Sequence, residues 1–254
     1  MVLPRFMEIL HETFDFDKSL NDIDDILAVT SERVQKFQKI PSSQEIGALQ
    51  LFVAVCTVVY VRLRPKPVTS LAAFGESASG RSQVLTFRQR VLAQHLFVDL
   101  MREQQKCFDF MFFGDDMCCV LDTAFQTDIN ELFELLAKFN SMLNILSRKG
   151  ELTGLPALEW GIGAHYGETF VSVNRYQAQD ERFNWSGLAF QTAFDLSNMA
   201  LKDAPNTIYT TDVFYQNLKD KYKELMRKKE SGIYTANIIN RPMKDWQTVN
   251  LDSK

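Results

Sequence analysis

The stretch CFDFMFFGDDMCCVL, residues 107–121, decides the fold of this chain. Two apolar runs, Cys107–Phe113 and Met117–Leu121, flank Gly114-Asp115-Asp116, and this pattern predicts a β-hairpin with a tight turn. The segments on both sides of the hairpin alternate between strand and helix patterns, with no internal repeat. The sequence therefore predicts one α/β domain whose sheet contains this hairpin.

The segments before the hairpin predict a strand, a loop and a helix. Leu51–Leu63 is apolar and rich in β-branched residues, which favours a buried strand, and a loop containing Pro and Gly follows over residues 65–80. The predicted helix Thr86–Gln105 then returns the chain to the sheet. Its apolar face is formed by Val91, Leu92, His95, Leu96 and Leu100.

After the hairpin, Asp128–Gly150 predicts a long amphipathic helix. Its apolar residues recur at helical spacing between an acidic start and a basic end closed by glycine. The rest of the chain continues the alternation of strands and helices. The predicted elements are two strands within Leu158–Val173 around Tyr166-Gly167, a helix over 188–202, a strand over Thr207–Thr211, a short helix over Asp212–Leu218 and a final strand over Ile233–Ile239.

Composition predicts one folded domain with an appended segment. Of the 254 residues, 46% are hydrophobic, which is enough for one sizeable core. Apolar residues at helical spacing, broken by polar segments, predict an N-terminal helical arm over residues 1–45, before the domain at 46–254. The net charge is −4 and the 28 Lys and Arg residues are scattered, so nucleic acid is not an expected partner.

The sequence predicts neither export nor a membrane span. The longest apolar run, Leu51–Val61, is much shorter than the ~20 residues that a membrane-spanning helix needs. The N-terminus carries one Arg and then acidic residues, unlike a signal peptide, so a cytoplasmic protein is expected. Four cysteines lie within predicted strands without metal-ligand spacing, and we expect reduced core thiols. They are Cys56, Cys107, Cys118 and Cys119.

Three motifs in the predicted strands occur in a recognisable order. They are Val-Tyr-Val-Arg-Leu-Arg at 59–64, Phe-Phe-Gly-Asp-Asp at 112–116 and Gly-Ile-Gly-Ala-His-Tyr-Gly-Glu at 161–168. At this separation they resemble the class III nucleotidyl cyclase domain. The resemblance covers almost the whole chain and implies an α+β sandwich, with a central, mostly antiparallel sheet flanked by helices.

Softer matches point to one branch of that family, the Pycsar pyrimidine cyclases of bacterial antiphage defence. They are Ile-Pro-Ser at 40–42, Thr-Asp-Ile-Asn at 127–130, Phe139-Asn140-Ser141, Ile238-Ile239-Asn240 and Trp246. The resemblance implies a homodimer or a heterodimer with another cyclase-like chain, and a ribonucleoside triphosphate as the bound molecule.

The family's reaction is the attack of a ribose 3′-hydroxyl on the α-phosphate, with two divalent ions held by two carboxylates. Aligned on the shared strand, the first carboxylate falls on Arg62, and no Asp or Glu lies between residues 53 and 74 to replace it. The second falls on Asp115, beside Asp116. These two are the metal candidates, although Asp is also an ordinary turn residue, and a guanidinium nearby would repel a divalent ion.

The nucleotide-binding positions of the family are altered as well. The run Ser186–Asp195 corresponds to the helix that supplies an Asn for the ribose and an Arg for the phosphate, and here these positions hold Gln191 and Asp195. Asp195 places an anion where the transition state needs a cation. The two purine-reading positions fall on Met111 and Leu188, and neither side chain can hydrogen-bond a base.

Other residues have both a structural and a functional interpretation. We expect Arg62 either to pair with Asp115 across neighbouring strands or to bind phosphate, with the ion pair preferred. His165 is expected to be packed and hydrogen bonded, and the charged segment 219–229 to be a solvated face. The phenylalanines around the hairpin are assigned by default to the core or to a dimer face.

Three functional hypotheses follow. The first is a catalytically impaired pseudo-cyclase that acts by nucleotide binding or dimerisation in antiphage defence and needs no cofactor. The second is an active pyrimidine cyclase that makes cyclic UMP or cyclic CMP from UTP or CTP with Mn²⁺ or Mg²⁺. It would use Asp115 and Asp116 as metal ligands and Arg62 as a phosphate clamp. The third is a dimerisation scaffold that binds no nucleotide.

Overall fold

A computed structural model of the chain describes residues 34–41, 51–66, 79–103, 106–177 and 180–252, with a few single positions between residues 17 and 28. The chain separates into two units, residues 1–35 and 36–254, and the second is described below. Within the helical arm predicted over residues 1–45, the described residues 34–41 contain the strand β1 (Gln35–Phe37) instead of a helix. The rest of the arm, apart from the few single positions, and most of the loop predicted over 65–80 lie outside the described residues and stay predictions.

The second unit is built on a mixed sheet whose strands run mostly antiparallel. Its order is β3-β4-β2-β5-β7-β9-β8, with β1 added beside β2 and β6 beside β5, and the pairing of β5 with β7 is parallel. The strands are β1 (Gln35–Phe37), β2 (Leu51–Pro65), β3 (Cys107–Phe113), β4 (Asp116–Leu121), β5 (Leu158–Gln177), β6 (Asp180–Ser186), β7 (Thr207–Thr211), β8 (Arg227–Glu230) and β9 (Ile233–Ala236).

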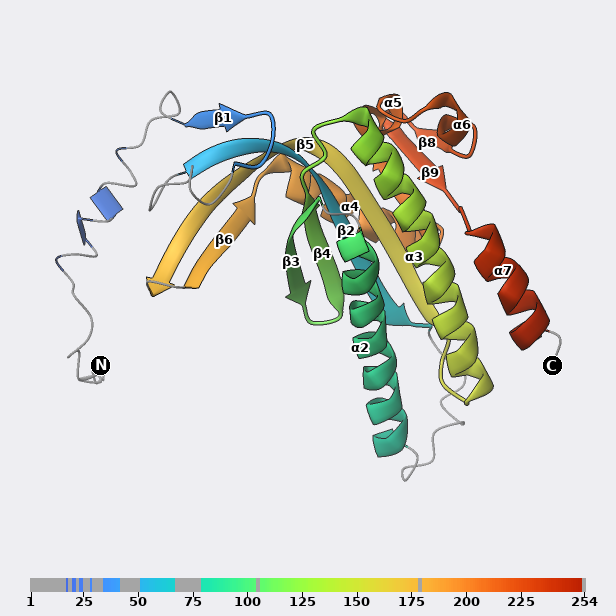
Figure 1. Ribbon diagram of the computed structural model, residues 1–254. Coiled ribbons are helices and arrows are strands. Elements are labelled where there is room, and N and C mark those ends of the chain that lie inside the picture. Colours follow the sequence, from blue (N-terminus) through green and yellow to red (C-terminus); the bar gives the residue numbers. More distant parts are fainter. Residues whose placement is uncertain are drawn as a thin grey trace, which may run out of the picture. The chain divides into compact units, whose positions relative to one another are not determined.

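Helices cover both faces of this sheet. One face carries α2 and α3 and the other carries α4 (Figure 1). The helices are α2 (Ser79–Glu103), α3 (Gln126–Leu152), α4 (Leu188–Asp203), α5 (Asp212–Gln216), α6 (Asp220–Lys223) and α7 (Arg241–Gln247), and a π-helical turn follows over Thr248–Asp252. This is the predicted α+β architecture. No helix in the described part of the chain is long and apolar enough to cross a membrane.

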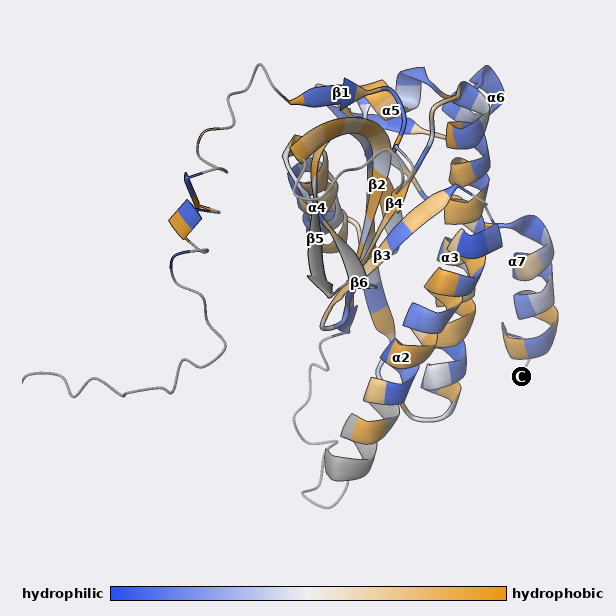
Figure 2. Ribbon diagram, turned by 60° about the vertical axis from the view of Figure 1, so that its left-hand side comes forward, coloured by the Kyte–Doolittle hydropathy of each residue, from blue (hydrophilic) through white to orange (hydrophobic). Residues whose placement is uncertain are grey.

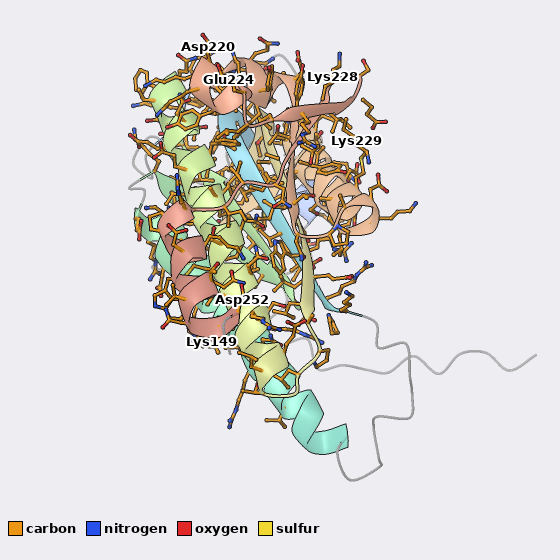
Figure 3. All side chains as sticks on the ribbon, turned by 90° about the vertical axis from the view of Figure 1, so that its right-hand side faces the viewer. Lys149, Asp220, Glu224, Lys228, Lys229 and Asp252 are labelled. Atoms are coloured by element: carbon orange, nitrogen blue, oxygen red, sulfur yellow. The ribbon has the colours of Figure 1, made fainter. Side chains whose placement is uncertain are left out.

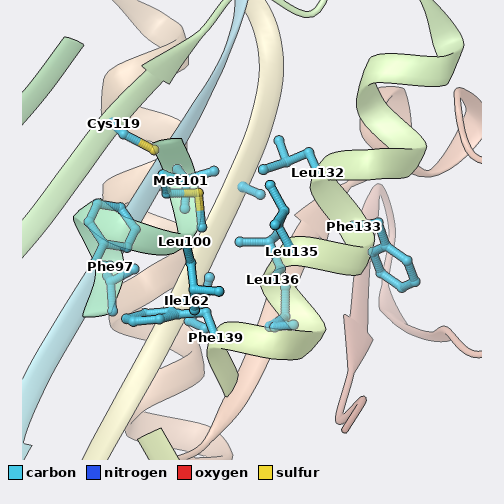
Figure 4. Close-up of a cluster of buried hydrophobic side chains, with 14 of the residues drawn as sticks. Phe97, Leu100, Met101, Cys119, Leu132, Phe133, Leu135, Leu136, Phe139 and Ile162 are labelled. Atoms are coloured by element: carbon cyan, nitrogen blue, oxygen red, sulfur yellow. The ribbon is translucent and has the colours of Figure 1, made fainter. Parts of the chain in front are cut away.

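The larger core lies between the sheet and the helices α2 and α3. Phe97 of α2, Phe139 of α3 and Ile162 of β5 are fully buried and meet in this layer (Figure 4). Each such side chain contributes about 1.5–3 kcal/mol when it leaves water. The hydropathy colouring agrees with this arrangement, because β2 and β4 are hydrophobic along much of their length and α3 alternates between hydrophobic and hydrophilic bands (Figure 2).

The long helix predicted over Asp128–Gly150 is confirmed as α3, but the prediction that Gly150 ends it is wrong, because the helix continues to Leu152. The Asp128 carboxylate accepts a hydrogen bond from the backbone N–H of Phe125 at 3.0 Å, so the acidic start satisfies an amide that would otherwise lack a partner. Lys149 stands in the last turn, where a cation is favoured. The hairpin, the strand from Leu51 and the helix over 188–202 are confirmed in the same way.

The prediction for α2 is wrong at its start and in its orientation. The helix begins at Ser79 instead of Thr86. Leu92 is 52% exposed and His95 is exposed, although the sequence pattern places both on the apolar face. The buried residues lie about a third of a turn away. They are Ala93, Phe97, Leu100 and Met101.

The prediction of two strands around Tyr166-Gly167 is also wrong, because β5 is one continuous strand of 20 residues. A Cβ atom added at Gly161 or Gly163 would overlap backbone atoms of α4, including the carbonyl oxygen of Ala193. The glycines of this motif therefore serve the close approach of α4 to the sheet. The unpredicted strand β6 follows β5 and pairs with its second half in the antiparallel direction.

The C-terminal segment differs from the prediction of a strand through Ile239. The strand β9 ends at Ala236, and the unpredicted helix α7 follows. The Asn240 side chain accepts a hydrogen bond from the backbone N–H of Met243 at 3.2 Å, and Pro242 occupies the first turn, where its missing N–H costs nothing. The elements α6 and β8 were also unpredicted. All four residues of β8 are exposed, at the end of the strand order.

Candidate functional site

The candidate site lies where the β3–β4 hairpin meets β2. Val61 of β2 is opposite Met117 of β4, so Arg62 comes close to Asp116 at the start of β4. The Arg62 Nε atom lies 3.0 Å from the Asp116 Oδ2 atom in an ion pair. The same guanidinium donates a hydrogen bond from Nη1 to the Asn198 side-chain oxygen, and thereby connects β2 to α4.

The neighbouring carboxylate has a different partner. Asp115 forms an ion pair with Arg90 of α2, and the Gln94 side chain donates a hydrogen bond to the Gly114 carbonyl oxygen at 2.9 Å. These contacts hold the hairpin turn against α2. The predicted Arg62–Asp115 pair is therefore wrong in its carboxylate, because the turn directs Asp115 toward α2 while Asp116 already belongs to the strand beside β2.

Burial controls the electrostatics of this cluster. Desolvation raises the pKa of Asp116 above its ordinary value of 3.8, and the nearby Arg62 guanidinium opposes this rise. Burial also raises the pKa of Tyr60 to about 12, with a further contribution from the Asp116 charge. The Tyr60 ring contacts Phe113 and Phe194, and the Arg62 guanidinium lies 5.3 Å from the Phe194 ring centroid.

His165 is packed and hydrogen bonded, as predicted. Its Nδ1 atom lies 2.8 Å from the Thr211 hydroxyl of the neighbouring strand β7. Burial lowers the pKa of this histidine, so the neutral ring is favoured. A neutral imidazole with a strand hydroxyl as its partner is a structural residue here.

Known proteins share this arrangement of strands and helices. No family model matches the sequence. A uridylate cyclase of Treponema porcinum is 20% identical over 219 residues, which are 84% of this chain and 74% of that protein. Among solved structures, the adenylyl cyclase CyaB from P. aeruginosa has a TM-score of 0.54 at 13% identity, with 76% of this chain and 98% of that chain covered.

Two further structures agree. The guanylyl cyclase Cya2 has a TM-score of 0.52 at 14% identity, with 77% of this chain and 97% of that chain covered. A class III adenylyl cyclase-like ATP-binding protein from Pseudomonas aeruginosa has a TM-score of 0.56 at 13% identity, with 90% of this chain and 49% of that chain covered. The chain has the class III cyclase fold.

The two-metal site of the cyclase fold does not fit these residues. Arg62 stands where the first carboxylate is expected, and its guanidinium already binds Asp116. The second carboxylate, Asp115, is paired with Arg90. Within the described residues, no group of three or more His, Cys, Asp or Glu side chains is placed to hold a metal ion. In this structure both carboxylates of the hairpin, Asp115 and Asp116, are thus paired with arginines.

The other positions that the resemblance to cyclases predicts for nucleotide binding lie on α4 and β3. Gln191 donates a hydrogen bond to Asp195 at 2.9 Å, one helical turn along the exposed side of α4. Leu188, at the start of α4, is 74% exposed. Met111 is half-buried and packs against the core cluster between the sheet and α4. Arg62 thus lies with the two aspartates, whereas these four positions form no cluster with them.

Three residues of the site were missed from the sequence. Arg90, Gln94 and Asn198 hold the hairpin turn and Arg62 in place. A signal for Arg90 was present, since it precedes Phe97 by seven residues and so lies on the same helical face. That face could not be identified from the sequence, because α2 carries apolar residues on two sides.

Phenylalanines surround the hairpin in two environments. Phe110 packs against Phe97 with ring centroids 6.1 Å apart, and it belongs to the core. Phe112 and Phe113 are 45% and 55% exposed. The prediction of core or dimer-face positions holds for Phe110, and the assignment of the exposed pair to a dimer face stays a prediction.

Proposed function

We propose that this chain is a pseudo-cyclase. In it, two arginine–carboxylate pairs replace the metal site, and the protein acts by binding a ribonucleoside triphosphate without cyclising it. The resemblance to the Pycsar branch extends the proposal to bacterial antiphage defence, with a second copy or another cyclase-like chain as the dimer partner. A relative named as a uridylate cyclase supports the pyrimidine cyclase branch, and a protein of this fold described as adenylyl cyclase-like and ATP-binding supports nucleotide binding.

The observation that carries the proposal is the ion pair of Arg62 with Asp116. At ~4 Å and an effective dielectric near 20, a divalent ion and a guanidinium repel each other by about 8 kcal/mol. A carboxylate at the same position would attract the ion by a similar amount. The exchange of one charge therefore reverses the electrostatic preference of the site for a divalent ion.

The charge on α4 points in the same direction. A cyclase needs a cation to stabilise the negative charge that develops on the transferred phosphate. Asp195 places a carboxylate at that position, where it accepts a hydrogen bond from Gln191. Both halves of the reaction centre therefore carry a charge of the wrong sign for catalysis.

The test is a turnover assay with each of the four ribonucleoside triphosphates and either Mn²⁺ or Mg²⁺, read by mass spectrometry. We expect no cyclic product above a control without protein. Cyclic UMP or cyclic CMP above that control would overturn the proposal and favour the active pyrimidine cyclase, and uridylate cyclase is the name of the Treponema porcinum relative. In that case Asp115→Ala should abolish the product.

Calorimetry separates nucleotide binding from a pure scaffold. We expect a saturable heat when UTP or CTP is titrated into the protein without divalent ions. A chain that only dimerises would give no heat of binding with any of the four triphosphates. That result would refute the proposed nucleotide binding and favour the scaffold hypothesis.

A further inference from the structure

A groove of about 560 Å³ runs between α3 and α7, on the outer side of α3. Its apolar lining includes Met142 and Ile145 from α3, and Met243 and Trp246 from α7. This volume lies within the 300–1,000 Å³ of typical small-molecule pockets, which are mostly apolar with a few polar groups. The groove lies apart from the arginine–carboxylate cluster and shares no residue with it.

Polar contacts on either side of α7 hold this helix beside α3. Before α7, the Asn140 side chain donates to the Ile238 carbonyl oxygen at 2.9 Å, and the backbone N–H of Asn240 donates to the Ser141 hydroxyl at 2.7 Å. After α7, Arg148 pairs with Asp252 at 3.3 Å. Within α7 itself no residue is buried.

The charges around the groove favour an anion at one end. The Lys149 ammonium lies 5.4 Å from the Trp246 ring centroid, and no carboxylate pairs with it within the described part of the chain. Figure 3 shows Lys149 on this side of the molecule, near the end of α7. At the other end, Lys138 is already paired with Glu103 at 3.0 Å. No described acidic residue lines the groove.

We propose that this groove binds a free fatty acid of medium chain length. The carboxylate lies at Lys149, and the alkyl chain runs along Met142 and Ile145 toward Lys138. Charge complementarity at one end and apolar side chains along the rest select an amphiphilic monoanion over a neutral or cationic ligand. Along α3, Lys149 lies 11 residues after Lys138, a rise of ~16 Å, which limits the length of chain that the groove can cover.

The first measurement is a calorimetric titration of the full chain with saturated fatty acids of increasing length, each below its micelle concentration. Each methylene that the groove buries should raise the affinity by about fourfold, until the groove is filled and the gain stops. An alkyltrimethylammonium ion of matched length should bind at least about tenfold more weakly. Equal binding of the cation, or no binding of any fatty acid, would overturn the proposal.

Two variants locate the site. Lys149→Glu should weaken binding of the best fatty acid by about tenfold or more, and Met142→Trp should abolish it by filling the groove. Lys228→Glu is the matched control, because it makes the same charge change on the exposed strand β8 and should leave the affinity unchanged. Circular dichroism checks that each variant is folded.

Two results would show that something else occupies the groove. If both Lys149→Glu and Met142→Trp bind like the wild type, the fatty acid binds elsewhere and the proposal fails. If Met142→Trp instead changes the sedimentation coefficient by disrupting a dimer, a second copy covers this face and the proposal also fails.

Discussion

Replacing Arg62 by aspartate should make the stability of this protein depend on manganese. The change removes the 3.0 Å ion pair with Asp116 and places a third carboxylate in the cluster. Two unit charges ~4 Å apart interact by about 4 kcal/mol at an effective dielectric near 20. The Arg62 side chain is 33% exposed, so water screens part of this energy. We expect the metal-free variant to lose about 2–4 kcal/mol of its free energy of unfolding.

Manganese should restore a large part of this loss, because the ion would bind the folded variant and not the unfolded chain. At an ion concentration of 100 times Kd the gain is about 2.7 kcal/mol. Chemical denaturation with and without Mn²⁺ measures both quantities. The wild type should show no manganese-dependent change, since the Arg62 guanidinium occupies the position of the missing ligand.

The matched control is Arg64→Asp, two residues further along β2. It makes the same charge change, but its partner is Glu159 at 2.8 Å and not the aspartates of the hairpin. This variant should be destabilised without any manganese response. The reasoning is refuted if manganese stabilises the wild type as much as Arg62→Asp, or if Arg62→Asp and Arg64→Asp respond alike.

Three further predictions follow from burial and packing. Gly163→Ala should cost at least about 2–3 kcal/mol of unfolding free energy, because the new Cβ overlaps the backbone of α4. The control Gly150→Ala meets only a movable glutamine side chain and should cost far less. Burial raises the pKa of Asp116, so its protonated form stabilises the folded state below pH 3.8, and this contribution is lost as the pH rises through the folded-state pKa. The free energy of unfolding of the wild type, relative to that of Asp116→Asn, should therefore fall as the pH rises from acidic to neutral, and chemical denaturation at a series of pH values measures it. The native protein should react with a thiol reagent at no more than the half-buried Cys107, and unfolding should release all four thiols.

The sequence predicted correctly those elements that depend on interactions between residues close together in the chain. The turn at Gly114 requires a positive φ, and its φ of 66° explains the glycine. The helix over Asp128–Gly150 carries its own acidic start and basic end. These features depend on neighbours within a few residues, so a pattern of adjacent residues is enough to predict them.

Features that depend on distant neighbours were not predictable in the same way. A glycine pair in an apolar run indicates a turn as readily as a close contact, and only the position of α4 shows that Gly161 and Gly163 permit a close contact. Arg62 pairs with Asp116 and not with Asp115, because β4 begins at Asp116 and Asp115 still belongs to the turn. Arg90 reaches the site from a helix whose orientation is fixed by the core.

The exposed strand β8 has a consequence for how this protein behaves at high concentration. Edge strands with unpaired backbone groups attract copies of themselves and seed aggregates. Here β8 carries three cations and one anion, so two copies of it repel each other overall. The aligned antiparallel approach of a second β8 would set Lys228 opposite Lys229 on both halves of the new pair, and the Arg227–Glu230 pairs at its ends would offset only part of this repulsion. This edge of the sheet therefore keeps neighbouring molecules apart. Aggregation through β8 should begin at a higher protein concentration at low salt than at high salt, where the repulsion is screened.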